Sequence, residues 1–145
     1  MSAGGLTLEI DRILPAPRTR VFRALTDPDE LAEWWGPHGF SCPSVEFGPR
    51  PGASYRIAMQ PPEGELFRLE GEFLEVDPPA RLSFSFRWDP PNPDDQETVA
   101  SLSLSERREQ TEVRLVQGPF ATEARRELHD QGWSDSFERL RALVS

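Results

Sequence analysis

The sequence predicts an α+β fold in which a curved antiparallel sheet of about six or seven strands wraps around a long C-terminal helix. Residues 42–117 alternate almost throughout between strand patterns and Pro- or Gly-rich turns, and residues 121–145 carry a helical apolar stripe. Two short helical patterns follow the first strand. Helices that are segregated from a run of antiparallel strands are typical of this class. The length of 145 residues predicts one domain, residues 1–145.

The first strand and the two short helices are predicted between residues 6 and 35. Residues 6–14 alternate apolar and polar side chains, as a strand does. Pro17 is well placed to begin a helix, whose apolar face is formed by Val21, Phe22 and Leu25. The second helix should have Asp27 as its N-cap and Pro28 at its first position. Gly36-Pro37 should end it.

Two adjacent tryptophans, Trp34 and Trp35, stand at the end of the second helix. Neighbouring side chains on a helix point about 100° apart, so one narrow apolar stripe cannot hold both rings. We therefore predict that one indole fills the core. The other should line or cover the space between the sheet and the long helix.

The remaining strands are predicted from their period-two patterns between residues 42 and 117. The clearest lies at residues 81–88, where Leu82, Phe84, Phe86 and Trp88 share one face and Ser83, Ser85 and Arg87 share the other. Gly71, in the middle of a long strand pattern, predicts a bulge or a sharp bend.

The C-terminal helix is predicted from a narrow apolar stripe formed by Trp133, Phe137, Leu140 and Val144. His129 falls on the same stripe, one turn earlier. Gly132 costs about 1 kcal/mol relative to alanine inside a helix, so it predicts close packing against another element or a bend.

Charge and composition exclude several classes of function. The net charge of −9 argues against nucleic-acid binding and against docking on an anionic membrane. No run approaches the roughly 18 apolar residues of a membrane span, and no signal-peptide pattern is present, so a cytoplasmic protein is expected. The single Cys42 cannot form an internal disulfide and is expected to be a small packed residue.

Four stretches together resemble the START-like (SRPBCC, helix-grip) superfamily: PAPRTRVFRALTDPDELAEWWGP, GEFLEVDPPARLSFSF, TEVRLVQGPF and HDQGWSDSFERL. The chain is most similar to the branch named for homology to the C-terminal domain of the activator of the 90 kDa heat-shock protein ATPase. The resemblance spans about Leu6 to Leu143. It implies a cavity between sheet and C-terminal helix. Members of the superfamily bind hydrophobic small molecules, and a few are cyclases or hydrolases, so the resemblance implies a function of this kind.

Aromatic residues are concentrated on the expected inner surface and form the candidate ligand-binding set. An apolar cavity with flat ring walls suits a hydrophobic ligand. The alternative is that the same rings simply fill a close-packed core. The set comprises Trp34, Trp35, Tyr55, Phe67, Phe84, Phe86, Trp88, His129, Trp133 and Phe137.

The polar candidates give a weaker signal. His129 would bond a ligand or act as a general base, or else it is a core-edge histidine with a neighbouring partner. His38 follows the paired tryptophans and is expected to be a solvated loop residue. Arg56, Arg68 and Arg87 alternate with apolar neighbours and should face solvent. Recognised catalytic motifs are missing, so we predict no catalytic residues, no metal site and no cofactor.

The sequence thus favours a domain that binds a hydrophobic small molecule. The first alternative is a protein-interaction module, with a chaperone or a second copy of the chain as its partner. That function predicts a filled interior and an exposed apolar patch. The second alternative is a small cyclase or hydrolase, which requires an inward carboxylate within reach of His129.

Overall fold

The computed structural model describes residues 6–145, which form seven strands and three helices around one hydrophobic core. The elements follow in the order β1 (Leu6–Leu14), α1 (Arg18–Thr26), α2 (Pro28–Trp34), β2 (Ser41–Glu46), β3 (Ser54–Gln60), β4 (Phe67–Asp77), β5 (Arg81–Trp88), β6 (Thr98–Arg107), β7 (Gln110–Phe120) and α3 (Glu123–Val144).

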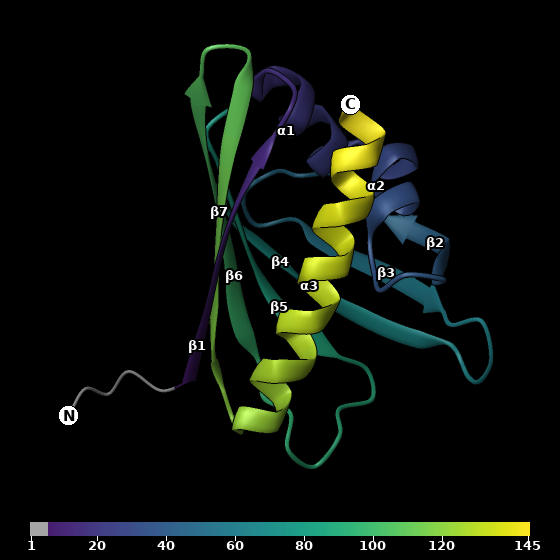
Figure 1. Cartoon of the computed structure of the whole chain (residues 1–145). Helices are drawn as coiled ribbons and strands as arrows, with labels where there is room; N and C mark the ends of the chain where they lie inside the picture. The colour runs from purple at the N-terminus through teal and green to yellow at the C-terminus, as the bar shows by residue number, and fades with distance from the viewer. Residues whose placement is uncertain (1–5) are drawn as a thin grey trace.

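All seven strands belong to one antiparallel sheet with the order β1-β7-β6-β5-β4-β3-β2. The sheet curves around α3, which runs along its inner side (Figure 1). The short helices α1 and α2 lie beside the C-terminal part of α3 and close that end of the sheet. The predicted helix-grip α+β fold is confirmed.

The boundaries of α2 follow from its capping residues. The carboxylate Oδ1 of Asp27 accepts hydrogen bonds from the backbone N–H of Asp29 at 2.9 Å and of Glu30 at 3.3 Å. Pro28 occupies the first turn, where its missing N–H costs nothing. The prediction of this N-terminus is confirmed. At the other end the helix stops at Trp34, and the chain turns through Gly36, which adopts a φ of +99°.

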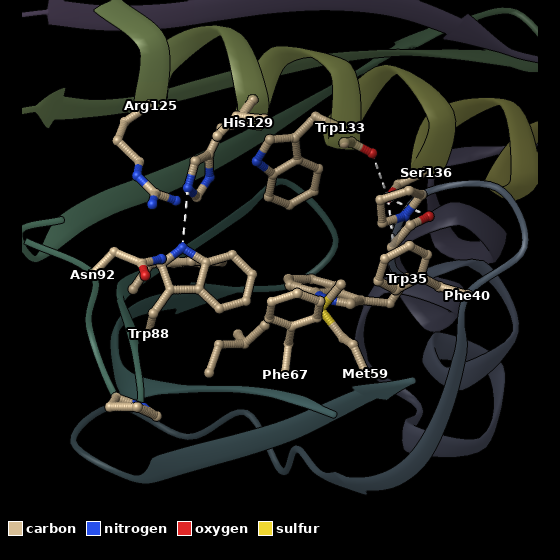
Figure 2. A pocket seen from close by; sticks show the side chains of 17 residues that line it. Trp35, Phe40, Met59, Phe67, Trp88, Asn92, Arg125, His129, Trp133 and Ser136 are labelled. Carbon is tan, nitrogen blue, oxygen red and sulfur yellow. Dashed lines mark hydrogen bonds between the residues drawn. The ribbon is translucent and has the colours of Figure 1, made fainter. Parts of the chain in front are cut away.

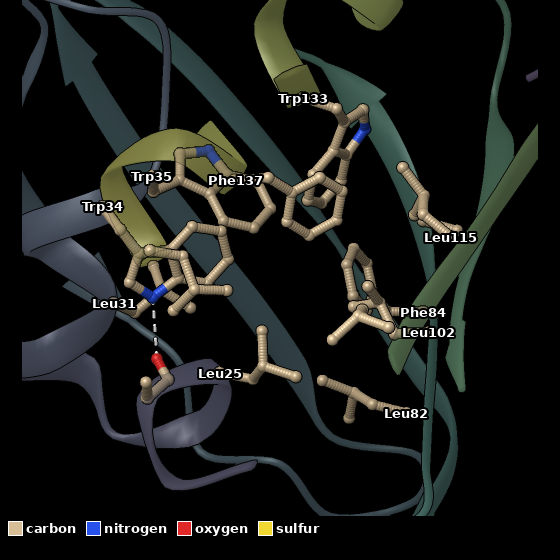
Figure 3. Packing of buried hydrophobic residues seen from close by; sticks show 14 of the residues in the cluster. Leu25, Leu31, Trp34, Trp35, Leu82, Phe84, Leu102, Leu115, Trp133 and Phe137 are labelled. Carbon is tan, nitrogen blue, oxygen red and sulfur yellow. Dashed lines mark hydrogen bonds between the residues drawn. The ribbon is translucent and has the colours of Figure 1, made fainter. Parts of the chain in front are cut away.

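The paired tryptophans point to different surroundings because the helix ends between them. Trp34 is only 1% exposed, and its indole N–H donates to the carbonyl of Ala24 on α1 at 2.8 Å (Figure 3). Trp35 is the C-cap residue of α2, and its ring packs edge-on against Trp133 of α3 with 5.3 Å between ring centroids. One indole therefore fills the core at the α1–α2 junction, while the other faces α3.

Gly71 allows β4 and β5 to approach closely. A Cβ at this position would lie 1.9 Å from the carbonyl oxygen of Ser85, so no other residue fits without moving the backbone. A bulge, one of the two features predicted at Gly71, is found a few residues further along β4, where the β4–β5 register shifts between Phe73 and Glu75.

The outer face of the sheet is less exposed at its centre than predicted. Arg56 and Arg68 face solvent as expected. Ser83 and Ser85 share the face of Arg87, for which solvent exposure was predicted, yet both serines are buried. Both belong to the central strand β5, where short side chains are screened by neighbouring strands. The Ser83 hydroxyl donates to Ser101 of β6, and the Ser85 hydroxyl accepts from the backbone of β4.

None of the helices within residues 6–145 is both long and apolar enough to cross a membrane.

Candidate functional site

A cavity of about 250 Å³ lies between α3, the inner surface of β3–β5 and the loop that follows α2 (Figure 2). Its walls are largely aromatic and aliphatic. The strands contribute Met59, Phe67, Leu69, Phe86 and Trp88; α3 contributes Arg125, Leu128, His129, Gly132, Trp133 and Ser136; and the loops contribute Trp35, Gly36, Pro37, Phe40, Pro90 and Asn92.

Six of the ten residues in the sequence-based set line this cavity: Trp35, Phe67, Phe86, Trp88, His129 and Trp133. The other four, Trp34, Tyr55, Phe84 and Phe137, are nearly fully buried and lie in the packed core outside this cavity lining. The Tyr55 hydroxyl, for example, donates to the Ser85 carbonyl at 2.7 Å, so its polar group is already bound within the protein.

The strand alternation could have identified one further lining residue. Met59 shares the face of Tyr55 and Ile57 in β3 and reaches the cavity because it lies nearer to the strand's end. Asn92 and Pro90 come from the polar loop after β5, and no sequence pattern predicts where such a loop folds.

Gly132 contributes open space to the cavity. Close packing against another element, one of the two explanations predicted for this glycine, is wrong, because a Cβ at this position would meet no atom of another element within 4 Å. The residue lines the cavity between His129 and Trp133 on the same face of α3. A glycine here keeps this part of the helix surface free of side-chain atoms.

His129 is held in the wall by an indole. Its Nε2 accepts a hydrogen bond from Nε1 of Trp88 at 3.2 Å, which places the proton of the neutral ring on Nδ1. Phe86 and Phe120 flank the ring, with centroids 5.2 and 4.8 Å away. Burial lowers the pKa of His129 to about 4, although the nearby Asp95 carboxylate opposes the shift. The imidazole is therefore neutral at pH 7.

This geometry does not provide the acid–base pair that a small hydrolase needs. Within residues 6–145 the recorded side-chain partner of His129 is the Trp88 indole, which has no acid–base function near neutral pH. The neighbouring Asp95 is engaged by Arg125, whose Nε lies 3.2 Å from it and 2.9 Å from Asp94. The Arg125 hydrogen bond lowers the pKa of the Asp94 carboxyl.

Trp133 is fixed by a buried polar chain. Its indole N–H donates to Oε1 of Gln117 at 2.7 Å, and Nε2 of Gln117 donates to the Thr98 hydroxyl at 2.9 Å. Gln117 and Thr98 are themselves buried on β7 and β6. Because each of these polar groups has a partner, the Trp133 ring is held in one orientation in the cavity wall.

The loop that follows α2 is bound to α3. The Ser136 hydroxyl accepts from the backbone N–H of Gly36 at 2.9 Å. The Arg139 guanidinium donates to the carbonyls of Glu33, Trp35, Gly36 and Pro37 over 2.9 to 3.2 Å. These contacts satisfy carbonyls that the end of a helix leaves free, and they fix Trp35 in the cavity wall.

Cys42 and His38 lie outside this cavity lining. Cys42 is half-buried in β2, with Sγ 3.5 Å from the Trp35 carbonyl, and burial raises its pKa to about 11. It is therefore a neutral thiol at pH 7. His38 is exposed on the loop after α2, as predicted.

The sequence profile of the family described as "Activator of Hsp90 ATPase homolog 1-like protein" matches residues 15–145. The chain belongs to this family. The START-like resemblance seen in the sequence is thereby confirmed, and with it the assignment to this branch of the superfamily. No curated protein matches the chain.

Solved structures of bacterial proteins have the same architecture. A Chromobacterium violaceum protein is 30% identical, with a TM-score of 0.86, and the match covers 95% of this chain and 96% of the other. A Nitrosomonas europaea protein is 28% identical, with a TM-score of 0.82 and coverage of 99% and 96%. The AHSA1 protein of Silicibacter pomeroyi, at 21% identity, shares the fold with a TM-score of 0.84 and coverage of 95% and 96%.

Proposed function

We propose that this family member is a single, cytoplasmic domain that binds a hydrophobic small molecule in the cavity between α3 and the sheet. The observation that carries the proposal is the cavity itself, about 250 Å³ of space walled by aromatic and aliphatic side chains. Sites for small molecules are typically apolar, with a few polar groups that fix orientation. A protein-interaction module would need no such space, because its interior could be filled by side chains.

The polar groups of the wall define the class of ligand. The indole N–H groups of Trp88 and Trp133 are already bound to His129 and Gln117, so neither is left as a free donor. Nδ1 of the neutral His129 ring carries a donor hydrogen, and the side-chain amide of Asn92 also lines the cavity. Arg125 is paired with two aspartates at the edge. The lining therefore favours a neutral, flat and largely apolar molecule whose few polar atoms meet His129 and Asn92.

Native mass spectrometry of the freshly purified protein, compared with the denatured sample, tests this proposal. A bound molecule adds mass that disappears on denaturation. The fluorescent apolar probe 8-anilinonaphthalene-1-sulfonate provides a second measurement, because its emission rises in an apolar site.

The matched variants are Gly132→Leu and Ala124→Leu. The first places a side chain in the open space beside His129, whereas the second adds the same side chain at an exposed position of α3. We expect Gly132→Leu to abolish probe binding and the extra mass while circular dichroism stays unchanged, and Ala124→Leu to retain both. Undiminished binding by a folded Gly132→Leu protein would contradict the proposal.

A protein-interaction function is a second candidate, favoured by two exposed apolar side chains at the cavity edge. Phe67 is 48% exposed and Leu128 is 60% exposed, and both also line the cavity. We propose a chaperone of the 90 kDa heat-shock class or a second copy of the chain as the partner. The double variant Phe67→Ser/Leu128→Ser should then lose stimulation of purified chaperone ATPase activity, or self-association in analytical ultracentrifugation. If the wild-type protein neither stimulates the chaperone ATPase nor self-associates, this candidate is excluded.

A further inference from the structure

A histidine and two carboxylates meet on the outer side of the loop that follows α2. Nε2 of His38 lies 3.0 Å from Oε1 of Glu138 and 3.8 Å from Oδ1 of Asp135. One donor atom from each of these three side chains lies within 4.8 Å of the others. Asp135 and Glu138 are three residues apart on α3 and so project from the same side of the helix. The three residues form what we call the His38 cluster.

Further hydrogen bonds hold the His38 cluster in place. The backbone N–H of His38 donates to Oδ2 of Asp135 at 3.3 Å, and Nε2 of Gln131 donates to Oδ1 of the same carboxylate at 3.0 Å. Asp135 is therefore oriented by a backbone group and a side-chain amide, as ligating carboxylates usually are. Ser136 and Arg139 bind the adjoining backbone of the loop to α3.

In the part of the chain that the structure describes, Arg139, which is next to Glu138 in the sequence, forms no ion pair with the carboxylates of the His38 cluster. Arg139 directs its guanidinium N–H groups at four backbone carbonyls of the α2 end and the following loop. The recorded contacts of Glu138 and Asp135 are instead with His38, with Gln131 and with the loop backbone. The imidazole nitrogen of His38 and the carboxylate oxygen of Glu138, 3.0 Å apart, are both potential metal ligands and are close enough to share one ion.

We propose that the His38 cluster binds a divalent transition-metal ion of the zinc or nickel type. An imidazole nitrogen with two carboxylate oxygens is a donor set that suits these ions, and solvent would complete the coordination. The histidine ring binds the metal through Nε2 in its neutral form, with its hydrogen on Nδ1. Two ligand atoms that bind one ion with bonds of roughly 2.0–2.2 Å lie roughly 3.0–3.5 Å apart. The separations of Nε2 of His38 from Glu138, 3.0 Å, and from Asp135, 3.8 Å, are close to this range.

The position of the His38 cluster gives such an ion a structural consequence. Gly36 and Pro37 line the cavity, and His38 follows directly in the chain as an exposed residue outside the lining. An ion held by His38, Asp135 and Glu138 would cross-link this loop to α3. The metal would thereby stiffen one wall of the cavity without entering it.

Isothermal titration of the full chain, prepared without a histidine tag, with Zn²⁺ and separately with Ni²⁺ tests the proposal. We expect one equivalent per chain and a raised thermal unfolding midpoint, because the ion binds only the folded arrangement. His38→Asn and Glu138→Gln should each weaken binding at least about tenfold. Glu127→Gln, which removes an exposed carboxylate of α3 outside the His38 cluster, should leave binding unchanged.

Co²⁺ substitution separates directed coordination from diffuse attraction to an acidic surface. We expect visible d–d absorption in the wild-type protein that disappears in His38→Asn. Binding that survives His38→Asn with the same affinity and stoichiometry would overturn the proposal, as would an absence of heat at millimolar Zn²⁺. Either result would leave the His38 cluster as a surface contact between the loop and α3 alone.

Discussion

Nε1 of Trp88 donates a hydrogen bond to Nε2 of His129 across 3.2 Å and so joins β5 to α3 in the cavity wall. The bond requires a neutral acceptor, because a protonated imidazole has no lone pair to offer. The flanking rings of Phe86 and Phe120 also disfavour a charge. This part of the cavity wall therefore depends on the protonation state of one histidine.

Acid should destabilise the protein through His129. Its pKa is about 4 in the folded chain, against the ordinary value of 6.5. Between these values the unfolded chain binds a proton that the folded chain does not, so stability falls as the pH is lowered. We expect His129 to account for a loss of about 2 to 3 kcal/mol between pH 7 and pH 4.5. Urea unfolding at the two pH values measures it.

The matched variant for this experiment is His129→Phe, which keeps a ring but cannot titrate. It should be less stable at pH 7 because the Trp88 N–H loses its acceptor, at a cost of about 1 to 3 kcal/mol. Its loss of stability between pH 7 and pH 4.5 should be smaller than that of the wild-type protein. Equal losses in both proteins would show that other groups are responsible.

Gly132→Ala should stabilise the protein. The substitution removes the backbone-entropy cost of a helical glycine, and the added methyl enters open space. We expect a gain of about 0.5 to 1 kcal/mol in the free energy of unfolding, measured by urea titration. A loss of stability would mean that the cavity is narrower at this point than the structure shows.

Substitutions of Trp133 should separate its volume from its hydrogen bond. Trp133→Ala empties a large buried volume and should cost about 3 to 5 kcal/mol. Trp133→Phe keeps most of the ring but leaves the buried oxygen of Gln117 without its donor, which costs about 1 to 3 kcal/mol. The double variant Trp133→Phe/Gln117→Leu serves as the control. If the Phe variant matches the wild-type protein, the bond to Gln117 contributes nothing.

Removing the guanidinium of Arg139 should release the loop after α2. Arg139→Met keeps much of the aliphatic stem but withdraws the donors from four carbonyls, at an expected cost of about 2 to 3 kcal/mol. Hydrogen exchange should quicken in residues 35–38. Arg50→Met, at an exposed position, should change stability by less than about 0.5 kcal/mol. Unchanged exchange in the Arg139 variant would show that Ser136 alone suffices to hold the loop.

The course of the chain was largely readable from local chemistry. The alternation at residues 6–14 and the cap formed by Asp27 and Pro28 predicted elements that the structure confirms within a few residues. The apolar stripe of the last helix was likewise correct, with Trp133 and Phe137 buried on it. These signals act over a few residues, so they survive without knowledge of the partners across the core.

Tertiary packing alone decided which aromatic rings border open space. Phe84 and Phe86 have the same period-two signal, yet only Phe86 reaches the cavity. Phe84 is instead surrounded by the rings of Phe47, directly after β2, of Tyr55 in β3 and of Phe73 in β4. The open space at Gly132 and the meeting of His38 with α3 depend in the same way on segments distant in sequence. The sequence by itself determined the order and the apolar faces of the elements, since these follow from local periodicity. Only the folded chain decided where those faces leave the interior unfilled, because a cavity is formed between side chains of segments that are distant in sequence.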